Sequence, residues 1–298
     1  MPKAKGPARN PSDIGIHHSK DAPKHEYLSL FQENTVGYQN RLIVCIPMTG
    51  LLRAEWVLAR FGQIIPTNWS QVDVMQWINT YSPLRYMVAD ARNCCTKKAV
   101  EGNFEWILFI DHDVILPPDC FVKMNQYMLK KEYPVVSGIY YTKSDPPEPL
   151  IYRGRGNSYF TDWRHGDKVW VDGIHMGCTL IHCSILKKMY EVSEEYYVGS
   201  DLVRKVFETP NDIWKDPETG NMQLKCGTED LAWCSRVIQE GWLEKAGWEK
   251  HAKKHPKYPF LMDTSIFGKH VNEAGQQFPH YWQTIEKNMK NYQGKEVL

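Results

Sequence analysis

The chain has 298 residues, of which 42% are apolar and 24% charged, and this composition is typical of a globular protein rather than a disordered or fibrous one. Its 36 Lys and Arg nearly balance its 35 Asp and Glu, so the net charge is +1. Proteins that grip long DNA duplexes usually have a clear basic excess, and any nucleic-acid contact is therefore expected from a local patch. We expect no membrane span and no signal peptide. The eight cysteines lack C-x-x-C spacing, which favours reduced thiols in a cytoplasmic protein.

The first 40 residues differ from the segment that follows them. Residues 1–40 are rich in proline and poor in apolar residues, and we expect an extended or loosely ordered arm. Next come an apolar run at 42–46, helical patterns at 53–64 and 90–100, and a second apolar run at 106–110. Buried strands that alternate with helices are typical of an α/β fold with a mostly parallel central sheet flanked by helices.

The alternation continues after residue 113. A loop-rich stretch at 143–166 and a polar, irregular stretch at 193–226 interrupt it. A basic stretch with five lysines runs from Lys245 to Lys257; it is either a solvated face or a contact for nucleic acid. The further predicted elements are helices at about 119–131, 184–190 and 229–240, and strands at 135–138, 169–171, 178–181, 260–262 and 265–267.

The sequence Asp111-His112-Asp113 directly follows a predicted buried strand. Ligands of open α/β sheets bind beyond the carboxyl ends of the strands, where these two carboxylates are expected. A hard divalent cation such as Mn²⁺ or Mg²⁺ would neutralise them, with a nucleotide diphosphate as a further ligand. The alternative is a polar turn in which an Asp caps the next helix.

A second acidic pair, Glu229-Asp230, begins a predicted helix, where it is either a partner of the helix dipole or a general base held in a fixed direction. His270 follows a strand-like segment and a glycine, and is either a ligand or an ordinary surface residue. Arg92 and Asn93 open the helix before the acidic strand, where Arg92 is suited to a phosphate or a base edge.

Taken in order, seven segments between residues 41 and 272 resemble the GT-A glycosyltransferases, in particular the family 2-like branch of phage and bacterial genomes. The segments are RLIVCIPMTG at 41–50, MVADARNCC at 87–95, EWILFIDHDVILPPD at 105–119, YPVVSGIYYTK at 133–143, GCTLIHCSIL at 177–186, GTEDLAWCSRVIQEGW at 227–242 and DTSIFGKHV at 263–271. The resemblance implies a GT-A (Rossmann-like) fold with a smaller acceptor-side sheet. It also implies a cytoplasmic enzyme of a bacterium or a phage-infected host.

The resemblance also implies roles for particular residues. Asp111, Asp113 and His270 would hold Mn²⁺ or Mg²⁺, and Asp230 would be the general base of an inverting transfer, with Glu229 supporting it or contacting the acceptor. The residues implied in binding the donor are Thr49, Arg92, Asn93, Asp111, His112, Asp113 and Gly177. The acidic residue that reads the nucleobase in this family is not evident, and Asp73 is the candidate for it.

The implied reaction is the metal-dependent transfer of a hexosyl group from a nucleotide-diphosphate sugar, with a UDP-sugar favoured, to an acceptor hydroxyl. The acceptor is a glycan or a hydroxymethylated base in DNA. The alternatives are a nucleotidyltransferase on a similar sheet and an inactive module that binds sugar nucleotides. The expected organisation is an arm at 1–40, one domain at 41–280 with a nucleotide-binding half (41–113) and an acceptor half (114–280), and a C-terminal helix or tail at 281–298.

Overall fold

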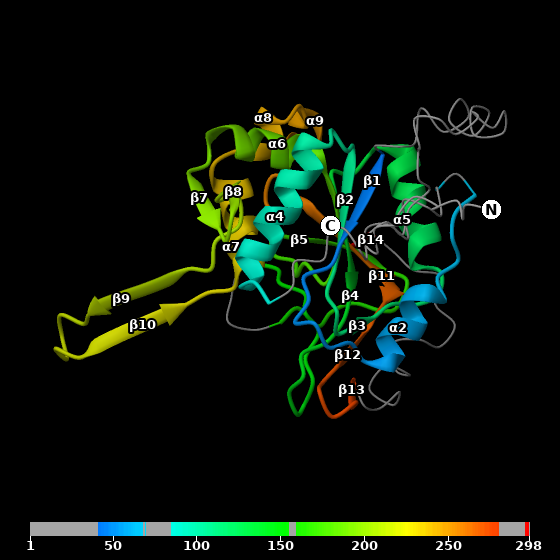
Figure 1. The fold of residues 1–298 in the computed structure, drawn as a ribbon, viewed down its shortest axis with the longest axis horizontal. Coiled ribbons are helices and arrows are strands. Elements are labelled where there is room, and N and C mark those ends of the chain that lie inside the picture. Colours follow the sequence, from blue (N-terminus) through cyan, green and yellow to red (C-terminus); the bar gives the residue numbers. More distant parts are fainter. Residues whose placement is uncertain (1–40, 68, 70–84, 155–158, 280–295, 298) are drawn as a thin grey trace, which may run out of the picture.

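The computed structural model describes residues 41–67, 69, 85–154, 159–279 and 296–297. The predicted arm, Asp73 and nearly all of the predicted C-terminal helix or tail lie outside these residues. Within them, a mixed α/β domain is built on a seven-stranded sheet (Figure 1). The order of its strands is β1 (Leu42–Cys45), β2 (Trp106–Ile110), β6 (Cys178–His182), β4 (Val135–Ile139), β11 (Phe260–Phe267), β5 (Lys168–Val171) and β14 (Glu296–Val297).

The predicted α/β class with a central sheet flanked by helices is confirmed. Strand β1 pairs in parallel with β2, and β4 pairs in parallel with β11. Strand β6 lies antiparallel between β2 and β4, so these four strands share one direction and β6 opposes them. On the far side, β5 is antiparallel to β11. All five residues of β2 are buried, as expected for a central strand covered on both faces.

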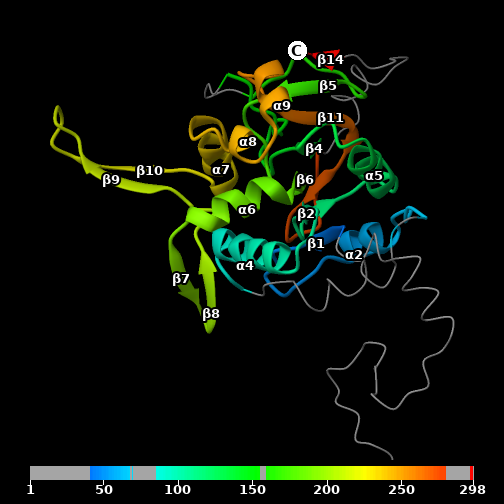
Figure 2. The same cartoon turned by 90° about the horizontal axis from the view of Figure 1, so that it is seen from above.

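Two buried clusters cover the two faces of the sheet, and their members come from different helices. The first contains residues of α4 (Val88–Glu101), α6 (Cys183–Val192), α7 (Glu229–Gln239), α8 (Trp242–Lys245) and α9 (Glu249–Lys254). The second contains residues of α2 (Ala54–Phe61) and α5 (Cys120–Lys130). Figure 2 shows the two groups of helices on opposite sides of the strands.

A small sheet lies beside the carboxyl ends of the central strands and positions residues of the candidate site. Its strands are β13 (Gln277–Phe278), β12 (Lys269–Val271) and β3 (Val114–Ile115). In this sheet His270 pairs with Val114, so His270 lies next to Asp113 although 157 residues separate them. The predicted smaller sheet is therefore present, and it brings a residue from the end of the domain to the acidic cluster.

The stretch 193–226 was expected to be irregular, and this expectation is wrong. It forms two antiparallel hairpins, β7 (Glu195–Val198) with β8 (Asp201–Arg204), and β9 (Asn211–Lys215) with β10 (Met222–Cys226). Their short strands carry many polar residues, so the period-two pattern of a half-buried strand is weak. The β9–β10 hairpin projects from the body and leads into α7 through residues 227–228 (Figures 1 and 2).

Candidate active site

The turn after β2 places His112 against the residues that follow β1. The backbone N–H of Asp111 donates to the carbonyl of Gly177, and that of Val114 closes the turn on the carbonyl of Asp111, each at 3.1 Å. The His112 ring nitrogens lie 3.1 Å from the Pro47 carbonyl and 3.3 Å from the Thr49 hydroxyl. Thr49 and His112 are therefore neighbours, as expected for residues at the carboxyl ends of paired parallel strands.

Asp113 faces two basic side chains from other parts of the chain. Its Oδ1 lies 3.5 Å from Nε2 of His270, and its Oδ2 forms an ion pair with Lys143, which follows β4. Burial opposes ionisation of this carboxyl, but His270 and Lys143 outweigh it and hold the pKa of Asp113 below its usual range. A cavity of about 580 Å³ opens here, lined by Thr49, Leu51, Leu52, Arg53, His112, Asp113, Lys143, Val271, Asn272 and Glu273; we call it the Asp113 cavity.

The pair of Asp113 and His270 fits a divalent cation. His270 Nδ1 lies 2.8 Å from the carbonyl of Tyr141, so Nδ1 donates, and Nε2 faces Asp113, where it can donate to the carboxylate when protonated or bind a metal when it is not. A histidine whose second nitrogen is fixed by a carbonyl is the usual arrangement at metal sites. Two acceptors that face each other at 3.5 Å need a proton or a metal between them. Across the described ranges, no three His, Cys, Asp or Glu side chains form a fuller metal site.

Arg92 is almost completely buried between the two acidic clusters. Its Nε donates to Oε1 of Glu229 at 2.9 Å and its Nη2 donates to Oδ1 of Asp111 at 3.0 Å. The guanidinium is 2% exposed and also lies over the Phe109 ring, 5.3 Å from its centroid. The resemblance implied that Arg92 contacts the donor; in the structure its partners are these two carboxylates. One side chain thus joins Asp111 to Glu229 across 118 residues of sequence.

Asn93 lies beside Arg92 on α4 but points away from the Asp113 cavity. It is fully buried, and its side-chain amide donates to the carbonyl of Phe207 and the hydroxyl of Tyr196. Its side-chain oxygen accepts from the backbone N–H groups of Val206 and Phe207. These four hydrogen bonds fix the segment after β8 to α4, and no atom of the Asn93 amide is left to bind a donor.

Gly177 lies at a close approach between the turn before β6 and Tyr140. Its N–H donates to the Tyr140 hydroxyl at 3.0 Å. A Cβ at this position would lie 2.7 Å from Cζ of Tyr140 and 2.9 Å from a methyl of Val114. The close partners of Gly177 in the structure are therefore the side chains of Tyr140 and Val114.

Asp230 lies in the first turn of α7, and both of its carboxylate oxygens have partners. Oδ1 accepts from the backbone N–H of Leu231 at 2.8 Å, and Oδ2 lies 2.5 Å from Nδ1 of His175. Burial opposes ionisation, but His175 and the Thr228 hydroxyl outweigh it, so the pKa of Asp230 is lower than usual. For the neighbouring Glu229, burial exceeds the opposing effect of Arg92 and raises the pKa.

Two residues of this site, Lys143 and His175, were not predicted from the sequence. Lys143 stands four residues after β4 and His175 three residues before β6, at the same edge of the sheet as Asp111. Only their position in the chain could have indicated these two residues, because polar residues at that edge of the sheet converge on one cleft. A lone Lys or His in a loop carries no such information until the order and direction of the strands are known.

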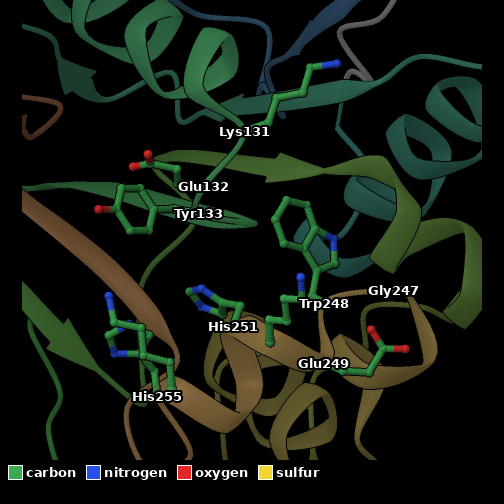
Figure 3. A pocket seen from close by; sticks show the side chains of 10 residues that line it. Lys131, Glu132, Tyr133, Gly247, Trp248, Glu249, His251 and His255 are labelled. Atoms are coloured by element: carbon green, nitrogen blue, oxygen red, sulfur yellow. The ribbon is translucent and has the colours of Figure 1, made fainter.

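The basic stretch from Lys245 to Lys257 lies at the other edge of the sheet. It lines a second cavity of about 630 Å³ together with the residues that precede β4 (Figure 3). In this view Trp248, His251 and His255 lie across from Tyr133, and the Lys131 side chain extends away from them. Because α7 begins with Glu229 and Asp230 and ends at Gln239, before this stretch, the length of the helix separates the basic cavity from the acidic clusters.

One family model matches part of the chain. Residues 80–190 match the model of a family described as "Glycosyl transferase family 2", and this segment contains Arg92, Asp111, Asp113 and Gly177. Over these residues the chain is similar to that family. The resemblance to family 2 GT-A glycosyltransferases is thereby confirmed, and it supports glycosyltransferase activity in general terms.

Among solved structures, the chain is similar to a protein from STIV known from a crystal structure, with a TM-score of 0.46 and 16% sequence identity over 80% of this chain and 90% of that one. None of the curated proteins matches the chain. In the part of the chain that the structure describes, no helix combines the length and apolar character that a membrane crossing needs.

Proposed function

We propose that the chain is a metal-dependent hexosyltransferase that moves a sugar from a nucleotide diphosphate, with UDP favoured, to an acceptor hydroxyl with inversion. The observation that carries this proposal is the position of Arg92, whose buried guanidinium contacts both Asp111 and Glu229. A glycosyl transfer needs the leaving diphosphate and the proton-accepting carboxylate on two sides of one sugar. The two acidic clusters are close enough to serve one sugar in this way.

On the donor side, Asp113 and His270 are proposed to hold Mn²⁺ or Mg²⁺. Asp111 is the second carboxylate of this side. The metal, when bound, stabilises the negative charge that develops on the leaving diphosphate. Lys143, beside Asp113, is suited to contact the same phosphates, and Thr49 and His112 line the same cavity on its nucleotide side. In this proposal Arg92, Asn93 and Gly177 support the site without contacting the donor. Arg92 holds the carboxylates, Asn93 holds α4, and Gly177 holds the turn before β6.

On the acceptor side, Asp230 is proposed as the general base. The attacking hydroxyl forms the new bond to the anomeric carbon, its proton moves to the Asp230 carboxylate, and the old bond breaks with its electron pair on the diphosphate. The lowered pKa of Asp230 keeps the carboxylate ionised at neutral pH, so it is ready to accept a proton. Glu229, held by Arg92, supports this end of α7.

The proposal covers residues 41–280 as one domain, with a nucleotide-binding half in 41–113 and an acceptor half in 114–280, and the acceptor half adds Lys143 and His270 to the donor side. A cytoplasmic location is proposed from the cysteines, because the seven that are described are free thiols and six of them are buried. The proposed acceptor is a glycan or a modified DNA base. A DNA acceptor predicts binding that weakens steeply with salt, whereas a neutral glycan does not.

The test is a panel of UDP-, GDP-, CMP- and dTDP-sugars, each with Mn²⁺, Mg²⁺ or EDTA, read by thermal shift and by release of the nucleotide. We expect one donor to raise the melting temperature in a metal-dependent way and to release its nucleotide slowly. Asp230→Asn should keep the thermal shift and lose transfer, whereas Asp113→Asn should lose the shift. If no donor stabilises the protein with any metal, the proposed function is wrong.

A further inference from the structure

A further residue of the acceptor side is His175, which lies in the turn before β6 and contacts Asp230. Its Nδ1 is 2.5 Å from Oδ2 of Asp230, and the two side chains are 14% and 7% exposed. The other carboxylate oxygen accepts from the N–H of Leu231. With one oxygen held by the helix and the other by the imidazole, the Asp230 carboxylate has a single orientation.

The protein also fixes the imidazole itself. The carbonyl of His175 accepts from the Thr179 hydroxyl at 2.6 Å, which ties its turn to β6. The ring lies between two tyrosines, with centroids 5.2 Å from Tyr152 and 6.4 Å from Tyr140. A side chain held by its backbone and by two aromatic rings delivers its N–H in a constant direction. This is the support that a reacting group needs from the residues behind it.

A buried carboxylate without such a donor would behave differently. Burial alone favours the neutral acid, which cannot accept a proton. Five other groups interact electrostatically with Asp230, and they are Arg92, Glu229, Tyr140, Tyr152 and Thr228. None of them replaces the contact with His175, because Thr228 and Glu229 belong to the same helix turn as Asp230 and the other three lie elsewhere in the site. Without His175 the hydrogen bonds that hold the carboxylate are those of its own helix turn, from Leu231 and Thr228.

We propose that His175 is the positioning residue of the general base, donating its Nδ1–H to Asp230 so that the carboxylate stays ionised and aimed at the acceptor hydroxyl. This inference rests on the proposed function, in which Asp230 accepts that proton. His175 does not itself take the proton. Its hydrogen bond persists through the step while the proton moves from the acceptor oxygen to Asp230.

Two variants separate positioning from proton transfer. His175→Asn places an amide N–H close to the position of Nδ1 and removes the imidazole ring, whereas His175→Leu removes the donor. With the transferase active, His175→Leu should lower kcat by about 100-fold, the loss expected for a misplaced catalytic group, with the KM for the donor unchanged. The acid limb of its pH profile should move to higher pH, because Asp230 loses a donor that favours its charged form. His175→Asn should restore most of kcat.

The control is His182→Asn at the opposite end of β6, which should leave kcat unchanged. If His175→Asn is as impaired as His175→Leu, the ring itself carries the proton and the positioning role is wrong. If both variants transfer sugar normally, His175 has no role in the reaction. A spectroscopic readout does not need activity: in the ¹⁵N-histidine spectrum of the full chain, His175 should carry its proton on Nδ1, and Asp230→Asn should change this signal. Absence of that tautomer overturns the inference, whereas its presence in a chain that transfers no sugar places the failure in the proposed function.

Discussion

Replacement of Arg92 by methionine should be among the most destabilising single changes in this domain. The substitution keeps much of the side-chain volume but removes the charge that Asp111 and Glu229 share. Breaking a buried ion pair by removing one partner typically costs about 3–5 kcal/mol, because the remaining charge stays buried. The Asp111 side chain is 24% exposed and can regain water, whereas that of Glu229 is 8% exposed and cannot. We therefore expect a loss in the lower part of that range.

The assay is equilibrium unfolding in urea at pH 7 and pH 5. Burial already raises the pKa of Glu229, and loss of Arg92 raises it further. A carboxyl whose pKa is higher in the folded state than in the unfolded state lowers the free energy of unfolding as the pH rises. The deficit of Arg92→Met should therefore be smaller at pH 5 than at pH 7. The double variant Arg92→Met/Glu229→Gln should lose at least about 1 kcal/mol less than the sum of the single losses.

The matched control is Lys188→Met, which removes the cation of an exposed pair with Glu191. Such surface pairs contribute roughly 0–1 kcal/mol, so the control should unfold almost as the wild type does. The reasoning is refuted if Arg92→Met costs less than about 1 kcal/mol, a surface-pair value. It is also refuted if the Arg92 and Glu229 losses simply add.

Three further predictions concern other parts of the site and the fold. His270→Gln should weaken binding of Mn²⁺ with the donor nucleotide by at least about 10-fold in calorimetry, because the imidazole ligand is lost, and undiminished binding would exclude His270 from the metal site. His182, whose pKa burial lowers to about 4, should make the free energy of unfolding fall between pH 6.5 and 4. His182→Asn, which keeps an acceptor at the start of α6, should flatten that slope, and an unchanged slope would be the contrary result. If the chain binds single-stranded DNA through the second cavity, Lys250→Gln/Lys254→Gln should weaken binding and reduce its salt dependence, and an unaltered salt slope would exclude that cavity.

The central elements could be predicted from the sequence because their signals are local. The apolar run at 42–46 corresponds to β1, which ends at Cys45 just before Pro47, and the helix expected at 229–240 corresponds to α7. Strand β11 was expected as two strands, 260–262 and 265–267, because polar residues interrupt the apolar pattern at Asp263 and Thr264. In the structure a register shift between Asp263 and Phe267 absorbs this interruption within one strand.

The contacts of the site could not be predicted in the same way. Arg92 was interpreted as a donor contact because its guanidinium is suited to a phosphate and because the resemblance implied that role, and nothing near it in the sequence shows that Glu229 will cover it. The contact between His175 and Asp230 likewise joins residues 55 positions apart. Both contacts depend on the order of the strands, with β6 reversed between β2 and β4, and this order is a property of the whole sheet.

The charges of the site explain why the two acidic clusters can lie so close together. The site gathers four carboxylates, those of Asp111, Asp113, Glu229 and Asp230, and pairs them with two permanent cations, Arg92 and Lys143. Counted without the histidines, these groups carry two net negative charges, and a nucleotide diphosphate would add to them. The proposed divalent cation at Asp113 and His270 would offset the charge of the diphosphate. Arg92 separates that anionic side from Asp230, so the base is shielded from the negative charge that leaves with the diphosphate.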